Sequence, residues 1–148
     1  MTLFENLLVG ASFSAKLKGQ DAEALAIDVL DRTGLLEKAN RPAGELTLLE
    51  RKRLELAKAL STQPALLLLD EIAGGLTEHE CHELVELINS LRKEGITLIW
   101  IEHIVHALVS VVDRLLVIDF GVKLDEGEPH AVMNNPKVQE IYMGISAE

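Results

Sequence analysis

A run of four leucines followed by two carboxylates, LLLLDE at 66–71, constrains the fold of this chain more than any other segment. Pro64 precedes the run and Gly74-Gly75 follows it, a setting that predicts a strand buried on both faces of a parallel sheet. Ligands of open α/β sheets bind just outside the carboxyl ends of the strands, where Asp70 and Glu71 would lie. Because unpaired carboxylates are costly to desolvate, a cation or a polarised water is their natural partner. Acids also end apolar strands at ordinary turns, so this stretch alone favours the functional interpretation only slightly.

Composition places the chain among globular proteins. Its 148 residues fit one domain, which can bury about two thirds of the unfolded chain's surface. The hydrophobic fraction of 48% is too high for a disordered chain, and the net charge of -10 argues against nucleic acid as a partner. The apolar runs are too short to cross a bilayer and the N-terminus lacks a secretory signal, so we expect a cytosolic protein. A single cysteine, Cys81, agrees with a reducing compartment.

Capping boxes, each a threonine followed three residues later by a glutamate, predict the starts of three helices. They are Thr2 with Glu5, Thr47 with Glu50, and Thr77 with Glu80. The second of these helices is expected to reach about Ser61, and the third to end at Gly95. A further helix is predicted to begin with Asp21 as its cap and to stop at Gly34. The first third of the chain is therefore predicted to be helical.

Strands and helices alternate from residue 64 onward. Residues 96–101 predict a second buried strand, with Glu102 and His103 at its tip. The remaining predicted elements are a helix over 104–112, strands over 114–118 and 122–125 joined by Phe120-Gly121, and helices beginning at Pro129 and Pro136, the last ending near Gly144. This alternation predicts an α/β fold with a layered, mainly parallel sheet, divided into a helical subdomain over 1–62 and an α/β portion over 63–148.

A basic cluster at 51–53, Arg-Lys-Arg, lies in the first turns of the helix that follows Thr47. A helix N-terminus carries about half a positive charge on its free N–H groups and attracts anions. Taken alone, a capped helix with a solvated basic face explains the cluster better. The cluster precedes Asp70 and Glu71, however, and His103 ends another strand. An anion-binding helix, a metal-binding acid, a base and a histidine at one edge are the parts that phosphoryl transfer requires.

Four segments resemble, in order, motifs of the ATP-binding cassette (ABC) ATPase family. LTLLERKRLELAKAL (46–60), LLLLDE (66–71), GGLT (74–77) and IEH (101–103) look like the signature segment, the Walker B strand, the D-loop and the H-loop. The strand ITLIWIEH and the ending NNPKVQEIYMG resemble the ATP-binding subunits of branched-chain amino acid importers. The resemblance runs along the whole chain and implies the C-terminal portion of a P-loop NTPase domain.

The resemblance implies roles in binding ATP with Mg²⁺ and in hydrolysing it. Asp70 would help to hold Mg²⁺ through water, Glu71 would orient and deprotonate the attacking water, and His103 would contact the γ-phosphate. Signature and D-loop residues would contact the ATP of a second subunit across a head-to-tail dimer. These residues are Thr47, Leu48, Leu49, Glu50, Gly75 and Thr77.

The chain departs from the family pattern in the signature segment and the D-loop. Thr47-Leu48-Leu49-Glu50 stands where the family has Ser-Gly-Gly-Gln, so two leucines crowd a site where glycine allows close approach. Glu50 adds a negative charge near phosphate, and its capping contact with Thr47 would soften the repulsion. Ile72 replaces a proline, and Thr77 replaces an acid or amide of the D-loop.

The phosphate-binding pattern Gly-x-x-x-x-Gly-Lys-Ser/Thr is missing from the sequence, which contains no Gly-Lys dipeptide. The resemblance implies that the Walker A and Q-loop regions precede the matched part, so we expect the chain alone to bind ATP weakly and to hydrolyse it negligibly. A sheet without its early strands would expose a strand edge and an apolar face. The implied partners are a separate N-terminal half carrying Walker A, a second ATPase subunit, and membrane permease subunits that hold the chain at the inner face of the membrane.

Other interpretations stay open. One is a non-catalytic, truncated subunit that serves as an interaction module. Another is the C-terminal lobe of a chromosome-maintenance (SMC-type) ATPase head, which would need a coiled-coil heptad run that residues 1–45 lack. His79 and His82 beside Cys81 suggest a metal site, but without a clear fourth ligand a polar helix face explains them better.

Overall fold

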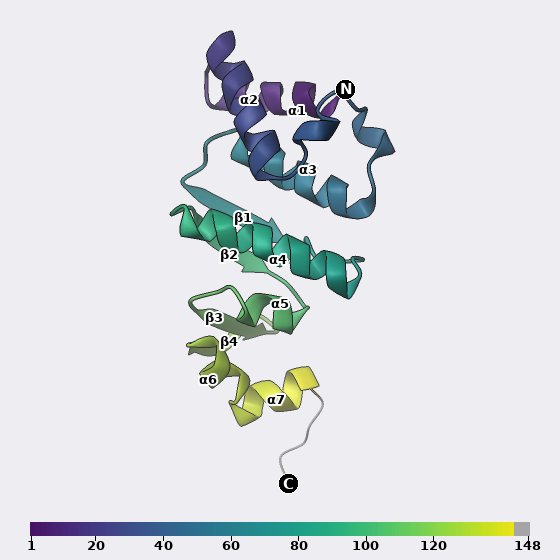
Figure 1. The fold of residues 1–148 in the computed structure, drawn as a ribbon. Helices are drawn as coiled ribbons and strands as arrows, with labels where there is room; N and C mark the ends of the chain where they lie inside the picture. Colours follow the sequence, from purple (N-terminus) through teal and green to yellow (C-terminus); the bar gives the residue numbers. More distant parts are fainter. Residues whose placement is uncertain (144–148) are drawn as a thin grey trace. The chain divides into compact units, whose positions relative to one another are not determined.

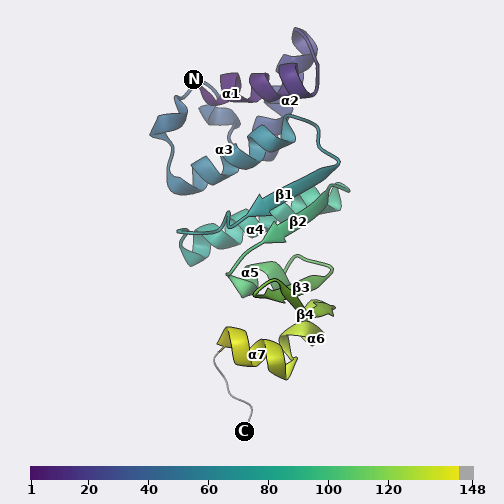
Figure 2. The same ribbon diagram turned by 180° about the vertical axis from the view of Figure 1, so that it is seen from behind.

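The structure is a computed structural model that describes residues 1–143. It divides into two compact units, Met1–His103 and Ile104–Glu148. Figures 1 and 2 show the order of the elements within each unit from two opposite sides. In the described part of the chain, no helix is both long and apolar enough to span a membrane.

Two helices and a short π-helical turn open the first unit. They are α1 (Leu3–Val9), η1 (Gly10–Ser14) and α2 (Gln20–Arg32). The Thr2 capping box is confirmed at the start of α1. The prediction that Asp21 caps α2 is wrong, because Gly19, with φ +52°, holds the cap position. Asp21 lies in the first turn, where its carboxylate still complements the helix dipole. Gly34 ends the helix as predicted, with φ +70°.

Two short 3₁₀ turns, η2 (Leu36–Lys38) and η3 (Ala43–Glu45), lead to α3 (Leu48–Leu60). The predicted capping box begins α3, and Ser61 is its C-cap. Gly10 lies against this end of α3, since a methyl group on Gly10 would lie 2.0 Å from Ser61 Oγ. Only glycine allows so close an approach. The helices contact one another through side chains that are almost wholly buried, among them Leu3, Leu7, Val29, Leu30, Leu56 and Leu60.

A two-stranded parallel sheet of β1 (Leu66–Asp70) and β2 (Thr97–Ile101) completes the first unit. The third capping box begins α4 (Glu78–Lys93), which connects the two strands and covers one face of the sheet (Figures 1 and 2). Leu67 and Leu69 are buried on the covered side, as are Leu84 and Ile88 of α4. The parallel pairing of the two motif-bearing strands, predicted from the sequence, is confirmed.

The opposite face of this sheet is open, so the prediction that both faces are buried is wrong. Leu66 is 46% exposed, Leu68 67%, Ile99 53% and Ile101 62%. These four residues are called the open face below. Burial alternates along β1 because α4 covers one side only, whereas four consecutive leucines suit a strand covered on both sides. The exposed apolar face expected for a sheet without its early strands is thus observed.

The second unit contains α5 (Val105–Val109), β3 (Leu115–Asp119), β4 (Val122–Gly127), α6 (Pro129–Met133) and α7 (Pro136–Met143). β3 and β4 pair antiparallel, and Phe120 and Gly121 between them have φ +43° and +79°, as a tight hairpin turn requires. Both predicted helix-starting prolines begin helices. The predicted helix end near Gly144 lies outside the described residues.

The boundary between the two units lies between His103 and Ile104. The helical segment 1–62 therefore shares its compact unit with β1, α4 and β2. The division at residues 62 and 63 marks the change from helices alone to alternating strands and helices, and as a domain boundary it stays a prediction.

Candidate functional site

The predicted site residues Asp70, Glu71 and His103 lie at the carboxyl ends of β1 and β2, which are paired in the sheet. Asp70 lies opposite Ile101 in the parallel register, and the Glu71 N–H donates to the Ile101 carbonyl over 2.9 Å. Asp70 and Glu71 are exposed, and the side chain of His103, two residues past Ile101, is 66% exposed. The two acids and the histidine therefore lie where parallel strands end, and all three are accessible to a ligand.

Glu71 has a strained backbone. Its φ is +47°, in the left-handed region that costs a residue other than glycine about 1–2 kcal/mol. The carbonyl of Glu71 accepts the N–H of Gly74 over 3.2 Å, so the chain turns sharply as it leaves β1. Strain of this kind persists where the surrounding structure fixes the backbone, and it is common at functional sites.

A third carboxylate, Glu102, lies at the strand tip as predicted, but its burial was not predicted from the sequence. Its side chain is 0% exposed, and its Oε1 accepts the N–H of Ala73 over 2.8 Å. Its Oε2 accepts the N–H of His103 over 3.1 Å and lies 3.4 Å from His103 Nδ1. The only signal in the sequence is an acid next to the histidine, because burial of that acid depends on the packing of β2.

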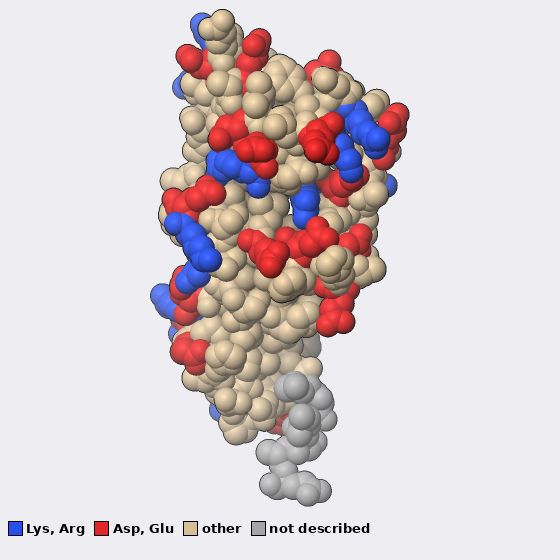
Figure 3. Space-filling view, viewed as in Figure 1, with Lys and Arg blue, Asp and Glu red and all other residues tan. Residues whose placement is uncertain are grey.

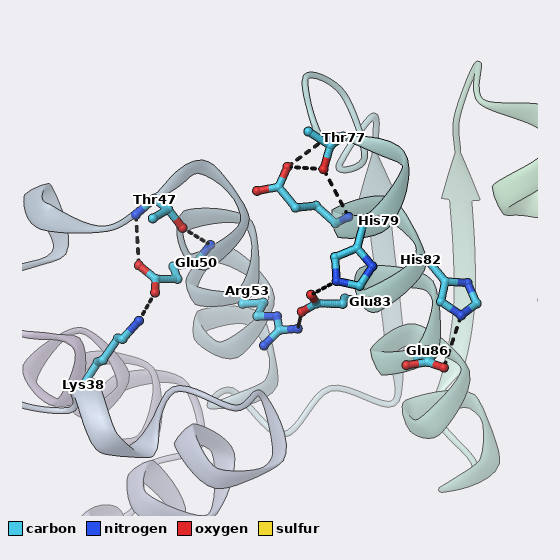
Figure 4. Close-up of polar contacts among 10 residues, drawn as sticks. Lys38, Thr47, Glu50, Arg53, Thr77, His79, His82, Glu83 and Glu86 are labelled. Carbon is cyan, nitrogen blue, oxygen red and sulfur yellow. Dashed lines mark hydrogen bonds and ion pairs between the residues drawn. The ribbon is translucent and has the colours of Figure 1, made fainter.

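The segment predicted to be the signature forms the N-terminus of α3 (Figure 4). The Thr47 N–H donates to Glu50 Oε2 over 2.9 Å, and the Glu50 N–H donates to Thr47 Oγ1 over 3.4 Å. The Thr47 hydroxyl accepts the Glu50 N–H, and its hydrogen bond to the Glu50 carboxylate also helps to lower the pKa of that group. Leu48 is 40% exposed, whereas Leu49 is 8% exposed, so Leu49 can offer a ligand little beyond its backbone.

Lys38 of η2 compensates the charge of Glu50. Its ammonium group forms an ion pair with Glu50 Oε1 (Figure 4). This contact, followed by the hydrogen bond from the Thr47 N–H, holds the pKa of the Glu50 carboxyl below its usual value. The negative charge of Glu50 at the start of α3 is therefore paired inside the protein. Sequence reasoning missed Lys38 because it precedes Glu50 by 12 residues, in another element.

The basic cluster 51–53 is partly used within the protein. Arg51 Nε donates to the Leu46 carbonyl over 3.1 Å, and Arg53 pairs with Glu83 of α4 at 2.6 Å (Figure 4). Lys52 lines a groove between α3 and β1 whose wall also includes Asp70. Both arginines are thus engaged within the protein. The prediction that this helix start binds an anion therefore relies mainly on Lys52 and on the N–H groups of the first turn.

The loop between β1 and α4 carries the predicted D-loop residues. Gly75 has φ +80°, and a methyl group there would lie 3.2 Å from Leu48 Cδ2, so the loop passes close to the start of α3. The Thr77 hydroxyl donates to Glu80 Oε2 over 2.8 Å and accepts the Glu80 N–H over 3.3 Å. Thr77 thus spends its hydroxyl proton on the capping box of α4, and its contact with a second subunit stays a prediction.

The histidines of α4 form pairs along the helix surface. His79 Nε2 lies 3.2 Å from Glu83 Oε1, and His82 Nε2 lies 3.3 Å from Glu86 Oε1 (Figure 4). Cys81 is 4% exposed, while both histidines are exposed, so these three residues do not converge on one metal ion. Acidic side chains gather over α4 in Figure 3, which agrees with a solvated polar face.

Comparison with known proteins identifies the family. The family model described as ABC transporter matches residues 1–74. LivG of Escherichia coli K12, a high-affinity branched-chain amino acid transport ATP-binding protein, is 40% identical. The alignment is 159 residues long and covers 97% of this chain and 62% of LivG. BraF of Pseudomonas aeruginosa, which has the same description, is 37% identical over 142 residues, covering 94% of this chain and 56% of BraF. The chain thus spans about three fifths of these relatives' length.

Solved structures agree in fold. MJ1267, an ATP-binding cassette of an ABC transporter solved in its ADP conformation, superposes with a TM-score of 0.85 at 31% identity, over 98% of this chain and 63% of that chain. A putative metal-chelate type ABC transporter superposes with a TM-score of 0.86 at 17% identity, which shows the fold alone. The predicted α/β fold of the P-loop NTPase class is confirmed, and the chain belongs to the ABC transporter family.

Proposed function

We propose that this chain supplies the water-activating and signature portion of an ATP-hydrolysing subunit of an ABC importer for branched-chain amino acids. The observation that supports the proposal is that Asp70, Glu71 and His103 lie at the carboxyl ends of two paired strands. The transported class is proposed because LivG and BraF are named for branched-chain amino acid transport. Both relatives are transport proteins, which favours an importer over an SMC-type ATPase head.

The residues present fit ATP with Mg²⁺. Mg²⁺ in nucleotide sites is held by one or two carboxylates together with waters and phosphate oxygens, and Asp70 is an exposed carboxylate in the right place. The N–H groups in the first turn of α3, which follows Thr47, suit the γ-phosphate of a nucleotide held by a second subunit. When bound, Mg²⁺ would neutralise charge on the phosphate oxygens.

Glu71 and His103 would perform the proton chemistry and the positioning. The exposed Glu71 carboxylate can accept a hydrogen bond from a water, align it in line with the γ-phosphate, and take its proton. The exposed imidazole of His103 would hydrogen-bond a γ-phosphate oxygen. Both groups lie on neighbouring strand ends, so one nucleotide can meet both.

The open face supports the proposal that a further polypeptide segment completes the site. Asp70 is exposed on the same side of β1 as Leu66 and Leu68, because side chains alternate along a strand. A segment that covers the open face would therefore also reach Asp70. We propose that this segment carries Gly-x-x-x-x-Gly-Lys-Ser/Thr and corresponds to the part of LivG that this chain does not match, joined to it or separate.

The proposal includes further partners and a place in the cell. A second ATPase subunit would complete a nucleotide sandwich through Thr47 and the Gly75 loop, and permease subunits would hold the assembly at the inner face of the membrane. The alternative is a non-catalytic module that presents only its signature helix to another subunit's ATP. The observation that favours this alternative is the lack of the phosphate-binding pattern in the sequence, whereas the crowding by Leu48 at that helix start counts against it.

Nucleotide binding and turnover test the proposal. The chain alone, titrated with ATP with and without Mg²⁺, is expected to show no micromolar binding. A fusion of the unmatched part of LivG to this chain is expected to hydrolyse ATP, and Glu71→Gln in the fusion should abolish hydrolysis while ATP still binds. Glu86→Gln, an exposed change on α4, is the matched control. Micromolar ATP binding by the chain alone, or unchanged turnover in Glu71→Gln, would contradict the proposal.

A further inference from the structure

We propose that Glu102 is a positioning residue that locks the turn after Glu71 and the backbone of His103 into one arrangement, an inference that rests on the proposed ATP hydrolysis. The side chain is 0% exposed and cannot itself touch a nucleotide. It is distinct from the exposed acids Asp70 and Glu71, which face solvent at the end of β1.

The contacts of Glu102 join two segments that are distant in the sequence. Oε1 accepts the Ala73 N–H over 2.8 Å, a contact that spans 29 residues, and Oε2 accepts the His103 N–H over 3.1 Å. A buried carboxylate is costly to desolvate and persists only where hydrogen bonds compensate its charge. Hydrogen bonds from N–H groups to a carboxylate are stronger than those between neutral groups. A single planar group therefore holds both segments.

The turn held by Glu102 is the one that carries Glu71. Glu71 has φ +47°, a conformation that needs support from its surroundings. The turn is closed by the Gly74 N–H, which donates to the Glu71 carbonyl over 3.2 Å, and it is anchored by the buried residue Ala73 through Glu102. Loss of that anchor frees the turn to relax, which misplaces the Glu71 carboxylate relative to His103.

Two variants separate the hydrogen bonds from the rest of the side chain. Glu102→Ala removes both acceptors. Glu102→Gln keeps the side-chain shape and one acceptor oxygen, but its amide group turns a donor toward one of the two N–H groups. Glu86→Gln makes the same chemical change at an exposed position of α4 and serves as the control.

Amide hydrogen exchange in the chain itself gives the first measurement. Glu102→Gln is expected to raise the exchange rate of the Ala73 amide, the His103 amide or both by about tenfold, since a hydrogen bond to a charged group contributes about 1.5 kcal/mol. The amides of Leu84 and Ile88 in α4 should change less than about twofold. Unchanged exchange at both Ala73 and His103 would overturn the inference. If Glu102→Ala also unfolds α4, the comparison of Glu102→Gln with Glu86→Gln decides.

Steady-state kinetics of the fusion with the unmatched part of LivG gives the second measurement. Glu102→Gln should lower kcat by about tenfold and leave the KM for ATP within about twofold, because positioning of Glu71 affects the reacting water more than nucleotide binding. Unchanged kcat in Glu102→Gln, with hydrolysis abolished by Glu71→Gln, would refute the positioning role and leave the proposed function standing. Hydrolysis that survives Glu71→Gln would instead refute the proposed function.

Discussion

Replacement of Leu68 and Ile99 by threonine tests whether the open face is a docking surface. The two residues are paired in the parallel register and are 67% and 53% exposed, so together they present a little more than one full apolar side chain to solvent. Burial of one such side chain contributes about 1.5–3 kcal/mol. In the double variant, the binding free energy of the segment that covers the open face should therefore fall by about 2–3 kcal/mol. This change corresponds to a loss of affinity of about 30-fold to 150-fold.

The stability of the chain itself should scarcely change. Threonine is a good strand residue, and exposed substitutions usually alter the free energy of unfolding by less than about 0.5 kcal/mol each. We would measure affinity by calorimetry between this chain and the unmatched part of LivG, and unfolding by urea titration. Ile27→Thr, at a residue of α2 that is 48% exposed, is the matched control. Unchanged affinity in the double variant, or a loss of more than about 2 kcal/mol of folding stability, would refute the docking role.

Two further predictions concern single carboxylates. The pKa of Glu50 is lowered by Lys38 and then by the Thr47 N–H, so its contribution to folding stability is fully present above pH 4.5, the usual value, and is lost as the pH falls below it. Urea unfolding at a series of pH values should show this loss in the native chain and a flatter profile in Glu50→Gln; equal profiles would contradict it. Glu71→Gly removes the strain of φ +47°, so its free energy of unfolding should stay within about 1 kcal/mol of the native value or rise. A larger loss would show that the Glu71 side chain stabilises the fold.

Local sequence signals predicted the elements well. The capping boxes at Thr2, Thr47 and Thr77 begin α1, α3 and α4, because each needs only a hydroxyl and a carboxylate three residues apart. The cap predicted at Asp21 was wrong: α2 begins at Gln20 with Gly19 at the cap position, and Asp21 lies in the first turn, where a carboxylate complements the helix dipole. Such shifts of one or two residues lie below what local patterns resolve.

Burial was the weaker part of the sequence-based predictions. A run of four leucines indicates apolar neighbours on both sides of β1, but the described residues supply them on one side only, through α4. The leucine run therefore indicates both a strand and an apolar surface that packs against the exposed face of that strand. Lys38 escaped notice for a related reason, since its contact with Glu50 exists only once η2 lies beside the start of α3.

The linear order of residues by itself determined the family, the strand ends that carry Asp70, Glu71 and His103, and the helix start at Thr47, because these depend on residue type and spacing along one chain. Only the tertiary structure decided that Glu102 is buried with its carboxylate bonded to the Ala73 N–H, and that Lys38 pairs with Glu50. The physical reason is that hydrogen bonds and burial are set by atoms far apart in the chain. The neighbours of a carboxylate in the sequence do not specify whether the packing of the fold will exclude that carboxylate from water.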